Sequence, residues 1–235
     1  MNSNKTNKLK LLIAGAFVAF SQYAAFGQSS TYEKMIVNDD ITSQYNVRGS
    51  LINSDGNAVI YGYQSKNNYD PFFAEVNPST GDTIKWVDVE GTLFPERMRS
   101  MVELPTGGYL GVGYTSRNSS NYPWIIKLKA NGDTVFTKSF HTYSNTFSNC
   151  TNTLQGYFND AIVNSSGDLI VTGQNDNCWQ YSTLIAQLDT ADGTIDWVKG
   201  NRTFNVQSGI TVESYRGNAI ALDGSNYIVV GGGYG

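Results

Sequence analysis

Charged and metal-binding side chains are scarce in this sequence. Only 15% of its 235 residues are Asp, Glu, Lys or Arg, and it contains one His and two Cys. Charged residues make up about 25% of a usual soluble domain. A multi-histidine zinc or copper site and an all-cysteine zinc site are excluded, because each needs more of these ligands than the chain has. Glu, Lys, Ala and Leu do not dominate the composition, which argues against a coiled coil or a helical bundle.

Motifs of catalysis and of nucleotide binding are also missing. The sequence has no Gly-x-Ser-x-Gly elbow, no Walker loop and no dinucleotide fingerprint. The single His141 lies in a polar segment with no evident partner. Asp39 and Asp40 are adjacent, so an extended chain would direct their carboxylates to opposite faces. We therefore predict no catalytic residue, no metal site and no cofactor.

The charge balance is acidic. The chain has 20 Asp and Glu against 16 Lys and Arg, a formal net charge of −4, and no cluster of basic residues. Nucleic acids and anionic membranes are bound through a positive field that this composition does not supply. We predict neither as a partner.

Residues 1–27 have the layout of a secretory signal peptide. Lys5, Lys8 and Lys10 precede an uncharged apolar run at residues 11–20, and small residues lie ahead of Gln28. This run is too short for a stable membrane anchor, and no later segment approaches 18 apolar residues. We predict cleavage of the signal, export, and no membrane span in the mature chain.

Glycine and tyrosine are plentiful, with 24 and 15 residues, and many belong to an internal repeat. Four similar segments each end in or just after a glycine, and these glycines are 51 to 60 residues apart. The segments are residues 54–63, 105–114, 165–174 and 223–232, with the glycines Gly62, Gly113, Gly173 and Gly231.

Each repeat unit is predicted to form four short β-strands. A third apolar strand follows each of the first three glycine segments, then a turn such as Asn131-Gly132-Asp133, then a strand containing Trp or Phe. Four strands in a unit of this length indicate an all-β fold, a β-propeller of which about three and a half blades are present. A β-sandwich is the alternative. The predicted blades span about residues 46–90, 97–142, 157–200 and, in part, 213–235 of a propeller region at 28–235.

These repeats resemble a known family. The Gly107-Gly108-Tyr109 turn, the strand ending in Gly113-Tyr114, residues 124–128 (Trp-Ile-Ile-Lys-Leu) and the turn at 131–133 are similar to secreted bacterial β-propeller repeat proteins. Those proteins resemble quinoprotein-type propellers in outline, and many are exported by type IX secretion. The resemblance implies a secreted or cell-surface protein of a Gram-negative bacterium, and it says little about function.

The last repeat stops early. Residues 231–235 match the end of a second strand, and residues 31–37 resemble an isolated fourth strand. We expect a truncated chain or a fragment of a propeller of roughly six to eight blades. A four-bladed closure with a defective blade is the alternative.

Two groups of residues are candidates for binding. Arg48, Arg99 and Arg216 lie 14 or 15 residues before a repeat glycine, near the start of a first strand. If these strands line a channel, the arginines could hold an anion; alternatively, they pair with carboxylates or carbonyls of neighbouring blades. The second group consists of aromatic residues in the loops between second and third strands: Tyr69, Tyr122, Trp179 and Tyr181.

The loop aromatics suit recognition of a glycan or a protein, because flat rings stack on sugars and the interleaved amides hydrogen-bond hydroxyls. Phe72 and Trp124 begin third strands, and for them burial between blades is the stronger expectation. Cys150 and Cys178 are predicted to form a disulfide, worth about 3–4 kcal/mol in the chain-entropy description; two unpaired thiols are the alternative.

The functional prediction is an exported, non-enzymatic binding or structural module at the cell surface. The competing hypothesis is a propeller-fold enzyme, either a quinoprotein-like oxidoreductase or a hydrolase acting on polysaccharide, or an accessory domain of one.

Overall fold

The computed structural model describes residues 45–65, 69–90, 92–141, 154–176, 182–201, 203–206, 210–213, 216–224 and 226–232. The chain divides into two compact units, Met1–Ile36 and Val37–Gly235, and every described residue belongs to the second. The predicted signal peptide, residues 31–37 and both cysteines lie outside the described residues.

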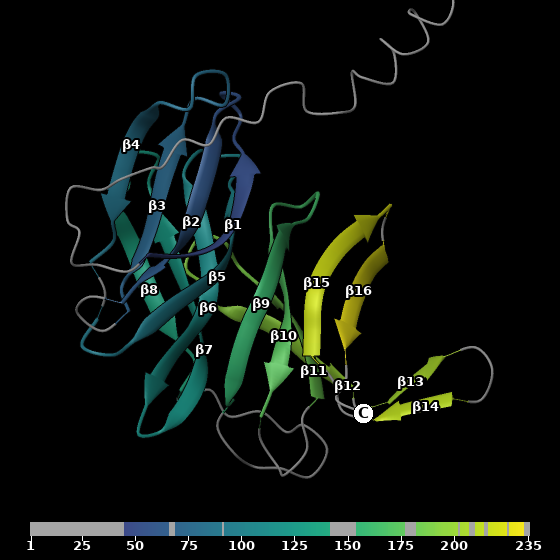
Figure 1. Cartoon of the computed structure of the whole chain (residues 1–235). Helices are drawn as coiled ribbons and strands as arrows, with labels where there is room; N and C mark the ends of the chain where they lie inside the picture. Colours follow the sequence, from purple (N-terminus) through teal and green to yellow (C-terminus); the bar gives the residue numbers. More distant parts are fainter. Residues whose placement is uncertain are drawn as a thin grey trace, which may run out of the picture. The chain divides into compact units, whose positions relative to one another are not determined.

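The described chain is all-β, and its main feature is three antiparallel sheets of four strands each (Figure 1). Within each sheet, consecutive strands are neighbours, as the repeats predict. The first sheet contains β1 (Tyr45–Ile52), β2 (Ala58–Gln64), β3 (Pro71–Val76) and β4 (Thr83–Asp88). The second contains β5 (Glu96–Glu103), β6 (Tyr109–Arg117), β7 (Ser120–Leu128) and β8 (Thr134–Ser139). The third contains β9 (Gly156–Val163), β10 (Leu169–Asn175), β11 (Ser182–Leu188) and β12 (Ile195–Asn201).

Two hairpins follow these sheets. β15 (Arg216–Asp223) pairs with β16 (Asn226–Gly232), which matches the two strands predicted for the last repeat. β13 (Thr203–Val206) pairs with β14 (Ile210–Glu213), a hairpin that the repeat pattern did not predict. None of the described sheets closes on itself. The described residues also contain no helix long and apolar enough to cross a membrane.

A β-bulge lies opposite each repeat glycine. In the first hairpin Gly62 pairs with Val47 and Tyr61 pairs with Gly49, so Arg48 is the extra residue between them. The same shift recurs in the other three hairpins. The four bulged residues are Arg48, Arg99, Asn159 and Asn218.

The bulge explains why this position is glycine. A Cβ on Gly62, Gly113 or Gly173 would lie 2.0 Å from a backbone carbonyl oxygen of the neighbouring first strand, and a Cβ on Gly231 would lie 2.3 Å from one. No side chain fits at such a distance. The repeat glycines therefore permit the close approach of two backbones at a bulge.

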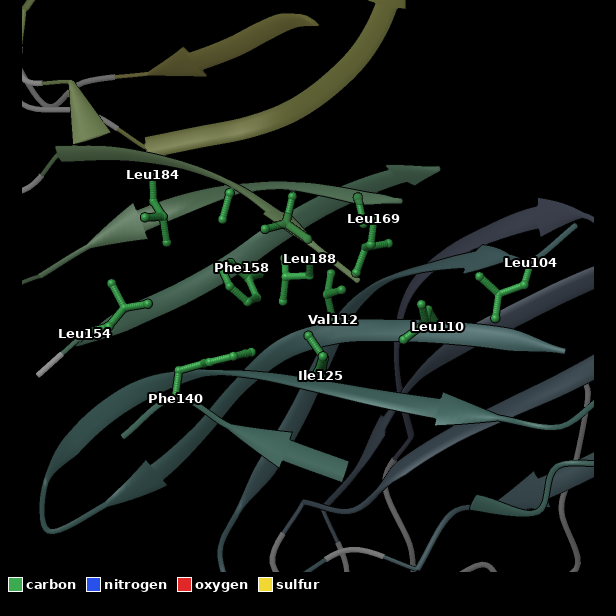
Figure 2. Close-up of a cluster of buried hydrophobic side chains, with 13 residues drawn as sticks. Leu104, Leu110, Val112, Ile125, Phe140, Leu154, Phe158, Leu169, Leu184 and Leu188 are labelled. Atoms are coloured by element: carbon green, nitrogen blue, oxygen red, sulfur yellow. The ribbon is translucent and has the colours of Figure 1, made fainter. Parts of the chain in front are cut away.

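Neighbouring sheets pack face to face through two hydrophobic clusters. One cluster joins the first and second sheets and includes Val59, Phe73, Met98 and Trp124. The other joins the second and third sheets, with Val112 and Ile125 against Phe158, Leu169 and Leu184 (Figure 2). The side chains of β7 alternate between the two clusters, because successive residues of a strand point to opposite faces.

Candidate binding site

The candidate site lies where the first strand of each unit begins and the second strand ends. The two strands are antiparallel, and the bulged residue of the first strand lies opposite the repeat glycine and the residue before it. In the first unit the Arg48 side chain reaches Tyr63, the residue after the glycine. This edge gathers arginines and tyrosines from several sheets. We call the following residues the arginine–tyrosine array: Arg48, Tyr63, Tyr69, Arg97, Arg99, Tyr114, Tyr157 and Arg216.

Tyr63 lies between two arginines of different sheets. Arg48 donates a hydrogen bond to the Tyr63 hydroxyl, and its guanidinium carbon lies 4.9 Å from the centre of that ring. Arg97, from β5, lies 5.5 Å from the same ring centre and only 4.2 Å from that of Tyr69. Arg97 Nη1 also donates to the Tyr114 hydroxyl at 2.8 Å. These contacts place two guanidinium groups against one phenol.

The alternation continues toward the third sheet and the last hairpin. Arg99 lies 5.1 Å from the Tyr114 ring centre and 4.3 Å from that of Tyr157, and Arg216 lies 5.9 Å from Tyr157. Arg99 Nη1 donates to Asn159 Oδ1 at 2.6 Å, and Asn159 Nδ2 donates to the Gly217 carbonyl at 2.8 Å. The bulged residues of the second and third units are thus linked by a hydrogen bond, and Asn159 continues the link to the last hairpin through Gly217.

The positive charge of the array is poorly compensated. Arg48, Arg97 and Arg99 form no ion pair with a carboxylate of the described residues; the ion pairs seen there involve lysines. The charges of Arg216 and Arg99 act on the carboxyl group of Asp176. Burial raises the pKa of Asp176, while its hydrogen bond from Gln174 and the charges of Arg216 and Arg99 act in the opposite direction. Aromatic faces offset part of the repulsion among the cations, and no carboxylate of the described residues forms an ion pair with Arg48 or Arg97.

Several hydrogen-bond donors in the array have no acceptor. Arg97 Nε is buried without a partner among the described residues. Tyr63 and Tyr114 are 6% and 7% exposed, and each hydroxyl oxygen accepts a hydrogen bond from an arginine. Their own hydroxyl hydrogens meet no acceptor within the described chain. Buried donors are normally satisfied, so these groups make the array a candidate site for a ligand that supplies acceptors, although Thr115 Oγ1 and Arg117 Nε, outside the array, are also buried without a partner among the described residues.

Tyr69 is held in a strained conformation beside the array. Its φ of 67° lies in the left-handed region, which aromatic residues rarely adopt. The next residue is fixed, because the Gln64 amide donates to the Asp70 carbonyl at 2.8 Å. The strain places the Tyr69 ring against Arg97 and edge-on to Tyr63, whose ring centre is 6.0 Å away. Strain of this kind is concentrated at functional sites.

The structure alters the predicted site in two places. Tyr122 was expected in a loop but lies within β7, paired with Thr115 and outside the array. Arg216 was expected to be equivalent to Arg48 and Arg99, but the register places Asn218 at that position. Trp179 and Tyr181 lie outside the described residues. Arg48, Arg99, Arg216 and Tyr69 are brought together in the array.

The two aromatic residues expected at the starts of third strands are buried in the structure. Phe72 and Trp124 are each 1% exposed, which confirms the expectation that they are buried. The array members Arg97, Tyr63, Tyr114 and Tyr157 were not predicted. For Tyr63 and Tyr114 a signal was present, because each directly follows a repeat glycine.

The single histidine lies beside a serine, but the pair cannot act as a nucleophile and base. His141 Nδ1 is 2.8 Å from Ser139 Oγ, and Nε2 is 3.3 Å from Arg117 Nη1. A guanidinium nitrogen can only donate, so Nε2 of a neutral imidazole is the acceptor and Nδ1 carries the hydrogen. His141 then donates to Ser139 and cannot remove its proton.

No protein-family model matches the sequence, and no curated protein matches it either. Within the described ranges, no three His, Cys, Asp or Glu side chains are placed together to hold a metal ion.

Proposed function

We propose that this chain is an exported, non-enzymatic β-propeller module that binds its ligand at the arginine–tyrosine array. The observation that carries the proposal is the set of unmatched donors at this edge. A purely structural role would leave the array with its hydrogen bonds and charges satisfied internally, as most buried polar groups are. A protein or a glycan could supply the missing acceptors.

The packing of the second sheet supports a propeller over a two-layer sandwich. In a sandwich, each sheet has one face in the core and one toward solvent. In β7, Trp124 and Ile126 belong to the cluster with the first sheet, while Ile125 belongs to the cluster with the third. A sheet covered on both faces by its sequence neighbours is what successive propeller blades require.

The carboxylates of the described chain do not favour a polysaccharide hydrolase. Burial and, to a smaller extent, the charge of Asp70 raise the pKa of Glu96, and pairs of carboxyl groups are the machinery of glycoside hydrolysis. However, Glu96 is 2% exposed, and Thr92 donates to it through both its amide and its hydroxyl. A buried, hydrogen-bonded carboxyl group does not reach a substrate.

Export is part of the proposal and has its own test. Residues 1–27 supply the signal-peptide pattern, and an oxidising compartment would permit a Cys150–Cys178 disulfide. The exported protein should begin at or near Gln28 and should gain two hydrogens in mass on reduction. Retention of the full-length chain inside the cell would contradict export, and an unchanged mass would contradict the disulfide.

The binding function is tested with a glycan array and a panel of extracellular proteins. The wild-type protein should retain at least one ligand without converting it, and the Arg48→Met variant should retain that ligand less well. Arg48 is exposed, so this substitution does not disturb the core. Turnover of a bound glycan, or binding that is indifferent to the array, would contradict the proposal.

A further inference from the structure

The donors of the array are selective for an anionic ligand. At the Arg48–Arg97 end, the polar groups that face one another are guanidinium nitrogens and phenol hydroxyls. Arginine can only donate hydrogen bonds, and the hydroxyl oxygens of Tyr63 and Tyr114 each already accept one from an arginine. A ligand group at this end must therefore offer acceptor oxygens, and a negative charge would also relieve the repulsion between the guanidinium groups.

The shape of the donors favours a carboxylate. Arg97 contacts the rings of Tyr63 and Tyr69 and donates to the Tyr114 hydroxyl, so its flat guanidinium is fixed before any ligand arrives. A fixed guanidinium presents parallel N–H groups that match the two oxygens of a carboxylate. Such preorganisation lowers the entropic cost of binding.

The array also repeats, which bears on the kind of molecule it would bind. An arginine–phenol pair occurs in each of two successive sheets, Arg48 with Tyr63 in the first and Arg97 with Tyr114 in the second. A folded protein rarely presents charges in a regular series, whereas an acidic polysaccharide does so along its length. Nucleic acid is also periodic, but its phosphates are dense and the net charge of this chain is −4.

We infer that the arginine–tyrosine array binds an acidic polysaccharide through its carboxylates, one near Arg48 and Tyr63 and a second near Arg97 and Tyr114. This inference rests on the proposed binding function and names its ligand class. The half-buried ring of Tyr69 lies beside both positions and offers a flat surface to a sugar.

The test measures the affinity of the purified protein for polygalacturonate, a chain of uronic acids, by titration calorimetry. We expect binding that weakens as salt is added, because charged groups carry it. Fully methyl-esterified polygalacturonate has the same backbone without the charges, and it should bind at least about tenfold more weakly.

Variants locate the binding. Arg48→Met and Arg97→Met should each weaken polygalacturonate binding about tenfold or more. Arg97→Lys should recover only part of the loss, because lysine keeps the charge but lacks the paired N–H groups of a guanidinium. The control is Lys129→Met, which removes one charge from a turn distant from the array, where Lys129 is 62% exposed and pairs with Asp133. This control should bind as the wild type does. Thermal unfolding of each variant checks that it is folded. If Arg97→Met is unstable, the Arg48→Met variant still tests the inference, because Arg48 is exposed.

Three results would overturn the inference. Equal binding of the esterified and the acidic polymer would show that carboxylates are not recognised. Preference for poly-glutamate or single-stranded DNA over polygalacturonate would indicate a different class of ligand. Array-dependent binding of a neutral glycan or a protein, with no binding of polygalacturonate, would refute this ligand class and leave the proposed function intact. If no ligand is bound, both fail.

Discussion

Replacing Gly113 by alanine tests whether close backbone approach is the reason for the repeat glycines. A Cβ at this position would lie 2.0 Å from the Arg97 carbonyl oxygen and 3.1 Å from the Met98 Cα. Side-chain carbons do not approach an oxygen to within 3.0 Å, so β5 must move by about 1 Å, which is an overpacking cost of about 1–3 kcal/mol. The movement also weakens one or two ladder hydrogen bonds, each worth about 1 kcal/mol. We expect the free energy of unfolding to fall by about 2–5 kcal/mol.

The assay is urea unfolding followed by tryptophan fluorescence, since Trp124 is paired with Gly113 across the β6–β7 ladder. Gly107→Ala is the matched control: its φ is +86°, and a Cβ there meets no atom within 4 Å. In this variant the only cost is that alanine must adopt the left-handed conformation, which lowers the free energy of unfolding by about 1–2 kcal/mol. If Gly113→Ala costs no more than Gly107→Ala, the close approach at the bulge does not explain the glycine.

Three further predictions concern stability. Burial and then the charge of Asp88 raise the pKa of Asp70 from its ordinary 3.8 to about 6. The protonated form therefore contributes its full stability below about pH 4, and this contribution is lost as the pH rises through 6. Asp70→Asn should therefore raise the free energy of unfolding at pH 7 by about 1 kcal/mol after allowance for partial exposure, and the gain should vanish at pH 4 in urea titrations. Trp124→Ala should cost about 3–5 kcal/mol by circular dichroism, because the side chain is 1% exposed and leaves a cavity. Lys127→Met removes a 2.9 Å hydrogen bond to the Thr190 carbonyl in the next unit. The free energy of unfolding should fall by about 1 kcal/mol when measured by calorimetry. No change would mean that this hydrogen bond does not stabilise the pair of sheets.

The strands could be predicted because the repeat gives each one several independent signals. The β10 segment, for example, aligns with β2, β6 and β16 and ends at a repeat glycine or just beyond it. Burial of Phe72 and Trp124 followed from their place in third strands. The β13–β14 hairpin lies between repeats, so no alignment within the chain indicated it.

The site was predicted less completely, for two physical reasons. The residues equivalent to Arg97 in the other units are Asn46, Tyr157 and Arg216. Because the residue type varies, alignment of the repeats does not single out Arg97 as a site residue. Tyr122 was assigned to a loop because the sequence between β6 and β7 lacks the Asn-Gly that usually marks a tight hairpin.

That turn is made instead by Asn118 and Ser119. Their φ values of 48° and 63° are both left-handed, as a two-residue hairpin turn of the favoured type requires. Because this turn is so short, β6 and β7 continue as paired strands to Arg117 and Ser120, and Tyr122 lies in the ladder rather than in a loop. Asparagine tolerates this conformation better than most residues, but Ser119 gives no such signal.

The repeat glycine and the array have a common cause in the bulge. A bulge changes the direction of a side chain, and here it occurs at the same place in four hairpins. The first two bulged residues are Arg48 and Arg99, and the next two are Asn159 and Asn218, so positive charge is concentrated at one end of a structurally regular series. Asn159 accepts a hydrogen bond from Arg99 and needs no anion. The charged ligand group that we infer therefore belongs at the Arg48–Arg97 end, while Asn159 is satisfied within the protein.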